Sequence, residues 1–294
     1  MASRLTDCKG GRLRPLAYMG GDMSRPLQLL VLPGLILVLV FLIIPSFDTL
    51  VASVFNPDFT TQNFSDIYNR PAYFQVLGRT MSVAMIVAIL CAVFGYPIAF
   101  YIVNQPANRQ IWLLYLFLIP MWMSALVRSY AWIVLLGREG IVNSILAAGG
   151  LIDEPLKMMY TSGAVYLVML QIMLPIQVFN SFSSMKEVDQ DLIKAARVLG
   201  AKPRDAVRRV FMPLSIHGTS TGAAIIFMMS TGFFVTPALV GGPKDMMLGN
   251  LITFQVERMN AGFAAALGVA LLVSALVGVL LIKGAANFVA RRFA

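Results

Sequence analysis

Few residues in this sequence could carry out covalent or metal chemistry. The chain has a single histidine, His217, and two cysteines, Cys8 in a polar stretch and Cys91 in an apolar one. His217 has no second His or Cys nearby to complete a zinc site, and the two cysteines occupy different environments, which disfavours a disulfide. The patterns GxxxxGK[ST], GxSxG and HExxH do not occur. We therefore expect no catalytic residue, no metal ion and no cofactor in this chain.

Arg128 is the one clear charge inside a long apolar stretch. A charge at the centre of a bilayer costs about 2.5–3.5 kcal/mol, so Arg128 should face protein or water rather than lipid. It could pair with a carbonyl or an acid for structural reasons, or it could contact a solute. Paired carboxylates of the kind that relay protons are missing from the apolar stretches, which argues against an ion-coupled carrier.

The longest charged run between two apolar segments, residues 183–213, has the pattern of a helix, a turn and a second helix. Gly200 can end the first helix, Pro203 can begin the second, and Pro213 is expected to end it. The apolar residues recur at three- and four-residue steps along one face: Val188, Leu192, Ala195, Ala196, Leu199, Ala206, Val207 and Val210. Nothing obvious elsewhere in the chain covers this face, so the segment is expected to dock on another molecule.

The rest of the chain is typical of an integral membrane protein. It is 58% hydrophobic and 13% charged, against about 25% charged residues in ordinary soluble domains. Apolar segments of about 20 residues, the length that crosses a bilayer, predict an all-α protein with six membrane-spanning helices. Their ranges are 27–47, 76–103, 111–136, 163–182, 214–239 and 262–282. This divides the chain into an N-terminal tail at 1–26, a transmembrane domain at 27–282 and a C-terminal tail at 283–294.

The positions of Lys and Arg predict the orientation. Most of the 23 basic residues fall in the two tails and in the 183–213 loop. Because cytoplasmic loops are enriched in Lys and Arg, both tails and this loop are expected in the cytoplasm. The six spans are expected to contact membrane lipid. Membrane topology therefore accounts for the net charge of +9, and a nucleic-acid partner is not expected.

Two spacings predict close helix packing. Gly218 and Gly222 form a small-xxx-small pair in the fifth predicted span, and Ser274 with Gly278 repeats it in the sixth. Packing is favoured over a direct role in gating. Trp112 and Tyr115 fall where aromatic side chains anchor a helix at the membrane interface.

The docking segment resembles the EAA loop of ATP-binding-cassette (ABC) importer permeases. Lys194-Ala195-Ala196, Gly200 after three residues, and Val210-Phe211-Met212-Pro213 after nine more match that pattern of E-A-A, G and I-x-L-P. The departure is Lys194, where the family usually has a glutamate that contacts the ATPase. Asp191, one turn earlier, is a possible substitute, in which case Asp191→Ala should uncouple ATP hydrolysis from transport.

The resemblance extends over nearly all six spans. The segments MWMSALVRSYAWIVLLG at 121–137, PALVGGPKDMMLGNLI at 237–252 and GFAAALGVAL at 262–271 are similar to the spermidine/putrescine branch of these permeases. Relatives of this branch handle opines, other amines and amino acids, small organic acids or ferric iron, so the solute stays open.

This resemblance implies a fold, partners and a cellular place. The fold is that of a type I ABC importer permease in the bacterial inner membrane. The partners are a second, homologous permease, two cytoplasmic ATPases that hold ATP and Mg, and a periplasmic solute-binding protein. Two other functions are also compatible with the sequence: an ion-coupled secondary carrier and a membrane scaffold subunit.

The resemblance also suggests which residues act. The expected ATPase-docking residues are Asp191, Lys194, Ala195, Ala196, Leu199, Gly200, Ala201 and Pro213. The residues that could line the solute path are Arg128, Tyr130, Gln171, Phe233, Phe234 and Thr236. For each of the path residues, an ordinary packing role is at least as plausible.

Overall fold

The computed structural model describes residues 32–55, 59 and 62–293. The predicted tail at 1–26 and the first residues of the first predicted span lie outside this part. The chain divides into two units, Met1–Thr49 and Leu50–Ala294. The described part of the first unit is helical and includes the π-helical segment Leu39–Ile43 and the start of α2 (Ile44–Ala52). Among the described residues, six helices are long and apolar enough to span a bilayer, as predicted.

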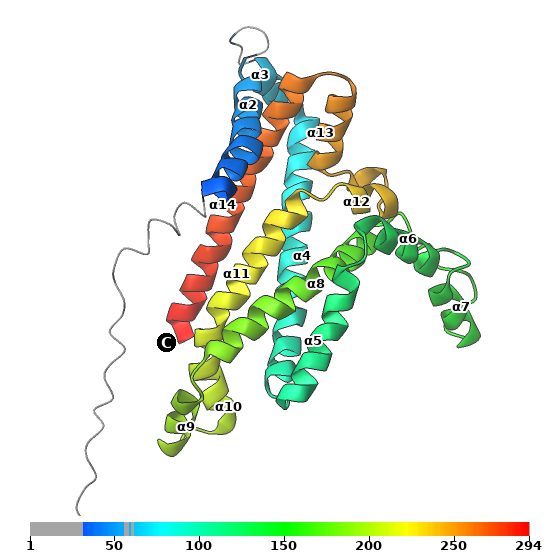
Figure 1. The fold of residues 1–294 in the computed structure, drawn as a ribbon. Coiled ribbons are helices and arrows are strands. Elements are labelled where there is room, and N and C mark those ends of the chain that lie inside the picture. The colour runs from blue at the N-terminus through cyan, green and yellow to red at the C-terminus, as the bar shows by residue number, and fades with distance from the viewer. Residues whose placement is uncertain (1–31, 56–58, 60–61, 294) are drawn as a thin grey trace, which may run out of the picture. The chain divides into compact units, whose positions relative to one another are not determined.

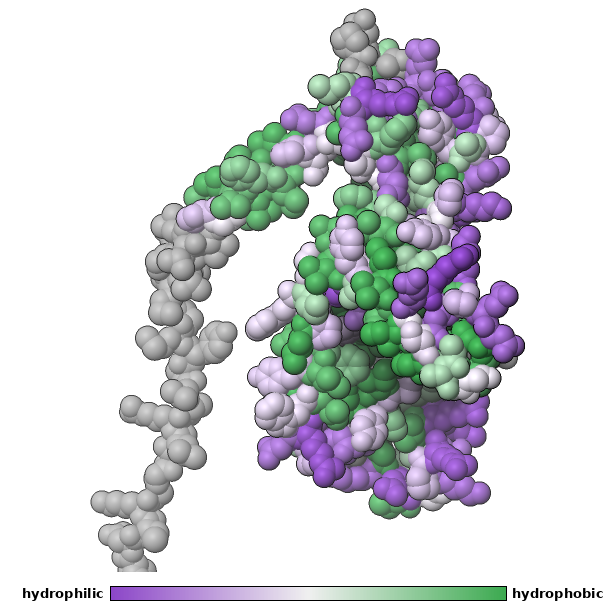
Figure 2. Space-filling view, turned by 90° about the vertical axis from the view of Figure 1, so that its right-hand side faces the viewer, coloured by the Kyte–Doolittle hydropathy of each residue, from purple (hydrophilic) through white to green (hydrophobic). Residues whose placement is uncertain are grey.

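Four long helices form the body of the second unit (Figure 1): α4 (Pro71–Val103), α8 (Ser162–Glu187), α11 (Met212–Thr231) and α14 (Ala261–Phe293). Helices α4, α8 and α11 contact one another pairwise, and α14 packs on α11. The predicted C-terminal tail from residue 283 continues α14 as far as Phe293. Figure 2 shows polar side chains at both ends of this unit and along its right-hand edge, with apolar ones over the rest of the middle. An apolar surface between polar ends is expected of a protein whose middle lies in lipid.

The shorter helices connect and flank this body. They are α3 (Gln62–Asn69), α5 (Ala107–Met121), α6 (Ala125–Leu136), α7 (Ile141–Ala148), α9 (Gln190–Val198), α10 (Pro203–Ala206), α12 (Val235–Val240), the 3₁₀ helix η3 (Pro243–Asp245) and α13 (Leu248–Glu257). No strand occurs among the described residues, so the all-α prediction is confirmed.

Glycines allow α4, α8 and α11 to approach closely. A Cβ built on Gly218 of α11 would lie 2.1 Å from Cβ of Ser184 on α8. One built on Gly222 would lie 2.9 Å from Oε1 of Gln177, and one on Gly95 of α4 would lie 2.6 Å from Cγ of the same Gln177. The small-xxx-small pair on α11 therefore packs against α8, as predicted from its spacing.

The third predicted span, 111–136, is wrong as a single helix. The chain breaks at residues 122–124 into α5 and α6. Pro120 stands at the end of α5, where the N–H of Trp122 bonds back to the carbonyls of Ile119 and Pro120. Ser124 then begins α6 by accepting the N–H of Leu126 on its Oγ at 3.3 Å. A proline near a helix end followed by a serine N-cap stops one helix and starts the next, and hydrophobicity alone does not reveal this.

The fifth predicted span, 214–239, also differs. Helix α11 ends at Thr231 with Gly232 as its C-cap, and α12 begins separately at Val235. At its other end the helix does not stop at Pro213 as predicted. Helix α10, the π-helical segment η2 (Val207–Phe211) and α11 follow one another without a break. Met212 N–H bonds to the Val207 carbonyl in η2. Pro213 then follows in the first turn of α11, where its missing N–H is tolerated.

Candidate functional site

The predicted docking helix forms as α9, with defined ends. Asp189 caps its N-terminus by accepting the Asp191 N–H at 2.8 Å. At its C-terminus the Ala201 N–H bonds to the Ala196 carbonyl and the Gly200 N–H bonds to the Arg197 carbonyl, both at 3.0 Å. This is a Schellman motif, which requires a left-handed residue after the helix, and Gly200 supplies it with a φ of +89°. The helix, glycine turn and second helix are therefore confirmed.

One part of the predicted docking face is not free. Val188 is 8% exposed and lies in a core cluster with Met185 of α8 and Phe211 of η2. Phe211 also makes an edge-to-face contact with Phe100 of α4, with ring centroids 5.5 Å apart. Ala206 of α10 is also buried, and Val207 packs against the same cluster, so the expectation that nothing in the chain covers this face is wrong at Val188, Ala206 and Val207. These contacts attach the docking segment to the membrane helices.

The part of the face at α9 is largely exposed, although Ala196 is partly buried. Leu192 is about half exposed, Ala195 is exposed and Leu199 is 87% exposed. Val198, which the sequence reading did not single out, is also 87% exposed. Val198 was missed because the three- and four-residue spacing of apolar residues selects its neighbour Leu199 at the end of the helix. We call Leu192, Ala195, Val198 and Leu199 the docking tip.

Asp191 and Lys194 form an ion pair on α9, with Lys194 Nζ donating to Asp191 Oδ1 at 2.7 Å. Both side chains are exposed. The hydrogen bond and the nearby charge of Lys194 lower the pKa of Asp191, and the same bond raises the pKa of Lys194. Asp191 therefore has its partner within α9, where it neutralises the lysine that replaces the family's glutamate.

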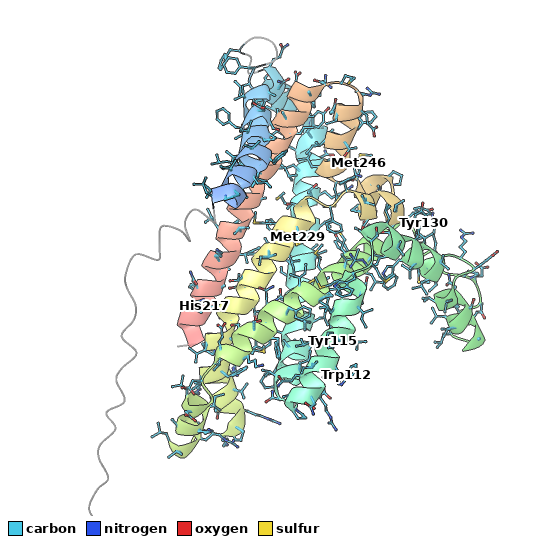
Figure 3. The ribbon with its side chains drawn as sticks, viewed as in Figure 1. Trp112, Tyr115, Tyr130, His217, Met229 and Met246 are labelled. Atoms are coloured by element: carbon cyan, nitrogen blue, oxygen red, sulfur yellow. The ribbon has the colours of Figure 1, made fainter. Side chains whose placement is uncertain are left out.

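A polar cavity of about 610 Å³ lies beside the docking tip. It opens between the end of α8, the link to α9 and the start of α11. It is lined by Asn180, Ser183, Ser184, Glu187, Val188, Asp189, Leu192, Leu214, His217, Gly218 and Thr221. His217, the single histidine, is thus an exposed polar residue at this end of α11 (Figure 3).

Two of the predicted path residues make hydrogen bonds between helices. Thr236 of α12 is fully buried, and its hydroxyl shares a hydrogen bond of 3.2 Å with Ser129 of α6. Gln171 of α8 accepts a hydrogen bond from Nε1 of Trp132 at 3.4 Å. Thr236 thus makes a packing contact, which is one of the two roles left open for it, and its place on the solute path stays a prediction. Arg128, on the same helix as Ser129, has a buried Nε with no hydrogen-bond partner among the described residues.

The aromatic path residues differ in exposure. Phe233 packs against the main core cluster, whereas Tyr130 of α6 and Phe234 before α12 are 58% and 42% exposed. Two exposed methionines, Met229 of α11 and Met246 before α13, join them as large side chains that are not covered by this chain (Figure 3). The methionines were missed because they lie in apolar runs where every residue looks like core or lipid contact.

Asp245 of η3 is a buried carboxylate. It accepts hydrogen bonds from the Ser162 hydroxyl and, at 3.0 Å, from the Gly242 N–H. These donors satisfy the acid, so it holds the turn between α12 and α13 rather than offering a free charge. Among the described residues, no group of three His, Cys, Asp or Glu side chains could hold a metal ion.

No protein-family model matches the chain. Curated proteins do match it. The chain is 34% identical over 197 residues to the "Spermidine/putrescine transport system permease protein PotB" of Escherichia coli K12, which covers 67% of this chain and 71% of that protein. It is 30% identical over 248 residues to the protein of the same name from Haemophilus influenzae, covering 81% and 86%.

A solved structure shares the fold. A chain of a bacterial alginate ABC transporter, crystallised with a periplasmic protein that carries an alginate pentasaccharide, superposes with a TM-score of 0.69 at 17% identity. The match covers 92% of this chain and 97% of that one.

Proposed function

Since the chain belongs to the family of ABC importer permeases that includes the spermidine/putrescine permeases, we propose that it forms one half of an import path for polyamines. It is a multi-pass inner-membrane permease subunit of a binding-protein-dependent importer. Membership in this family removes the two alternatives from other classes, an ion-coupled carrier and a scaffold. The solute, the residues that contact it and the orientation of the chain are proposals.

The observation that carries the mechanism is the way the docking tip is attached. The tip is exposed, while Val188 beside it is buried with Phe211, and Phe211 stands in a helix that continues into α11. A partner that grips the tip and moves it would move α11 and α8 with it, because protein cores transmit displacement instead of deforming. The tip is thus the point at which ATPase motion enters the permease.

The ATPases are separate subunits in this proposal. They bind ATP and Mg, and this chain contributes no catalytic residue to hydrolysis. Two such ATPases sit on the docking tips of two permeases, this chain and a homologous one, and a periplasmic binding protein delivers the solute. The Lys and Arg content of the 183–213 segment supports a cytoplasmic position for the tip, with both chain termini on the same side.

Exposed aromatic and thioether side chains support a cationic solute. Tyr130 and Phe234 have partly exposed aromatic rings, a kind of side chain to which an ammonium group can bind, and the partly exposed Met229 and Met246 add polarizable contacts. The acid of Asp245 is already satisfied within this chain, so discrimination by charge would fall to the second permease or to the binding protein. The path is proposed to run along these four side chains, between the two permeases.

Reconstitution tests this proposal. The purified complex of both permeases and the ATPase is placed in liposomes with the binding protein, and ATP hydrolysis is measured with spermidine, putrescine, amino acids, opines and ferric compounds. Stimulation by spermidine or putrescine, with uptake of the same compound, is expected. Stimulation by another solute alone would keep the importer and refute the polyamine assignment. An ATPase variant that cannot hydrolyse ATP is the control for uptake.

A further inference from the structure

The docking tip is surrounded by positive charge. Residues 192–204 contain Lys194, Arg197, Lys202 and Arg204, with Asp189 and Asp191 before them and Asp205 directly after them. All four cations are exposed. Asp191 pairs with Lys194, whereas neither Asp189 nor Asp205 forms an ion pair among the described residues. Arg197, Lys202 and Arg204 therefore have no carboxylate partner among the described residues of the chain.

These cations flank the two most exposed residues of the docking tip, Val198 and Leu199. Arg197 directly precedes Val198 and Leu199, while Lys202 and Arg204 follow the Gly200 turn that reverses the chain. The Schellman turn, with its two 3.0 Å backbone hydrogen bonds, holds the cations on both sides of the tip. The surface is thus a small apolar knob with a basic rim.

We propose that the cognate ATPase receives this tip in an apolar hollow bordered by carboxylates. This rests on the proposed function, in which the ATPase docks at the tip. The proposal adds the chemistry of the partner's surface. The rim of the ATPase hollow carries acidic side chains, whereas an ATPase that binds a loop with glutamate at this position would need a basic side chain there. Lys194 stands where the E-A-A pattern has a glutamate, whose negative charge an acidic hollow would repel, and Asp191 neutralises Lys194.

The position of the tip favours a soluble protein over a lipid surface as the occupant. In Figure 1, α9 and α10 extend past the ends of α4, α5 and α14, away from the apolar middle of the unit. Helix α9 has nine residues, and its Ile193 packs against the core cluster of α8 and η2, so the helix is not free to lie flat in a bilayer interface. Anionic lipid headgroups are the competing occupant, and the test separates them.

The test is ATPase binding to the permease complex in nanodiscs, measured against salt. Exposed charges at an interface rim govern the on-rate and the salt dependence of binding. For the natural complex, Kd should weaken as NaCl rises from about 50 to about 500 mM. The R197E/K202E variant should bind roughly tenfold or more weakly at low salt and lose most of that salt dependence. R109E, which reverses an exposed cation outside the loop, should stay within roughly twofold.

The outcomes distinguish the inference from the function beneath it. If the natural complex binds the ATPase but R197E/K202E binds equally well or more tightly, the acidic hollow is refuted and docking stands. If ATPase binding by the natural complex requires anionic lipid in the nanodisc and the variant abolishes only that requirement, lipid occupies the rim and the inference fails. If the natural complex and an L199D variant both fail to bind the ATPase, the proposed function itself is refuted.

Discussion

Replacing Gly218 with alanine should separate helices α8 and α11. The added Cβ would lie 2.1 Å from Ser184 Cβ, 2.5 Å from Ser184 Oγ and 3.2 Å from the Asn180 carbonyl oxygen. Ser184 Cβ is fixed to the backbone, so changing its rotamer gives no relief. The helices themselves must move.

The size of the effect follows from these distances. Carbon atoms pack at about 3.5–4.0 Å, so the 2.1 Å approach is short by about 1.5 Å or more. Overpacking of this kind costs about 1–3 kcal/mol. Alanine in place of a helical glycine should by itself gain about 0.5–1 kcal/mol. Because the overlap is large and falls on an atom fixed to the backbone, the cost should lie in the upper part of that range, about 2–3 kcal/mol, and a net loss of about 1–2.5 kcal/mol in the free energy of unfolding is expected for G218A.

Denaturation of the purified permease in mixed detergent micelles, followed by the loss of helical signal, measures this loss. G268A is the matched control, because Gly268 lies within α14 and a Cβ there would meet nothing within 4 Å. G268A should be as stable as the natural chain or more so. The double variant G218A/S184G removes the atom that the new Cβ strikes, and it should recover part of the loss despite breaking the Ser184 to Ser215 hydrogen bond.

Unchanged stability of G218A would refute the close contact between α8 and α11. Equal losses for G218A and G268A would show that helix propensity or lipid exposure, rather than this contact, determines the effect. A double variant that is only as stable as the sum of its single changes would place the strain elsewhere than Ser184.

Three further predictions concern turns and charge. Met259 has a φ of +58° at the end of α13, so M259G should raise the free energy of unfolding by about 1 kcal/mol in the same denaturation assay. G200A should lower solute-stimulated ATP hydrolysis through backbone strain of about 1 kcal/mol at φ +89°, with the membrane helices intact by circular dichroism. Lys194 lowers the pKa of Asp191. The stabilisation of α9 by this ion pair should therefore be complete above about pH 4 and be lost as the pH falls through the lowered pKa of Asp191. Amide hydrogen exchange of α9 should show this loss of protection at acid pH, and the D191N variant should not show it.

Sequence periodicity was most informative where local chemistry decides the structure. The α9 helix, its glycine turn and the packing of Gly218 follow from spacing and residue type, and these predictions are confirmed. The break between α5 and α6 was missed because hydrophobicity is continuous across residues 111–136. At residues 122–124 the continuous hydrophobicity predicts one helix, whereas Pro120 and the Ser124 N-cap predict a break between two.

Contacts between distant segments could not be predicted in this way. The burial of Val188 depends on Phe211, and the pairing of Thr236 depends on Ser129, more than 100 residues away. A polar residue near a membrane path and a polar residue that fastens two helices look the same in a sequence. The assignment of the ATPase-docking residues stays a prediction until binding is measured.

The π-helical segment η2 has a consequence for how this chain can change over time. It lies between the docking turn and α11, and it holds five residues, Val207–Phe211, in a wider turn than an α-helix uses. Deleting one of them would return the segment to α-helical hydrogen bonding, and the wider turn would absorb the lost residue with little rotation of the docking tip. A one-residue deletion in the α-helical part of α11 would instead turn the tip about the helix axis by roughly 100°. The η2 segment is therefore the place along this helix where a change of chain length disturbs the direction of the tip least.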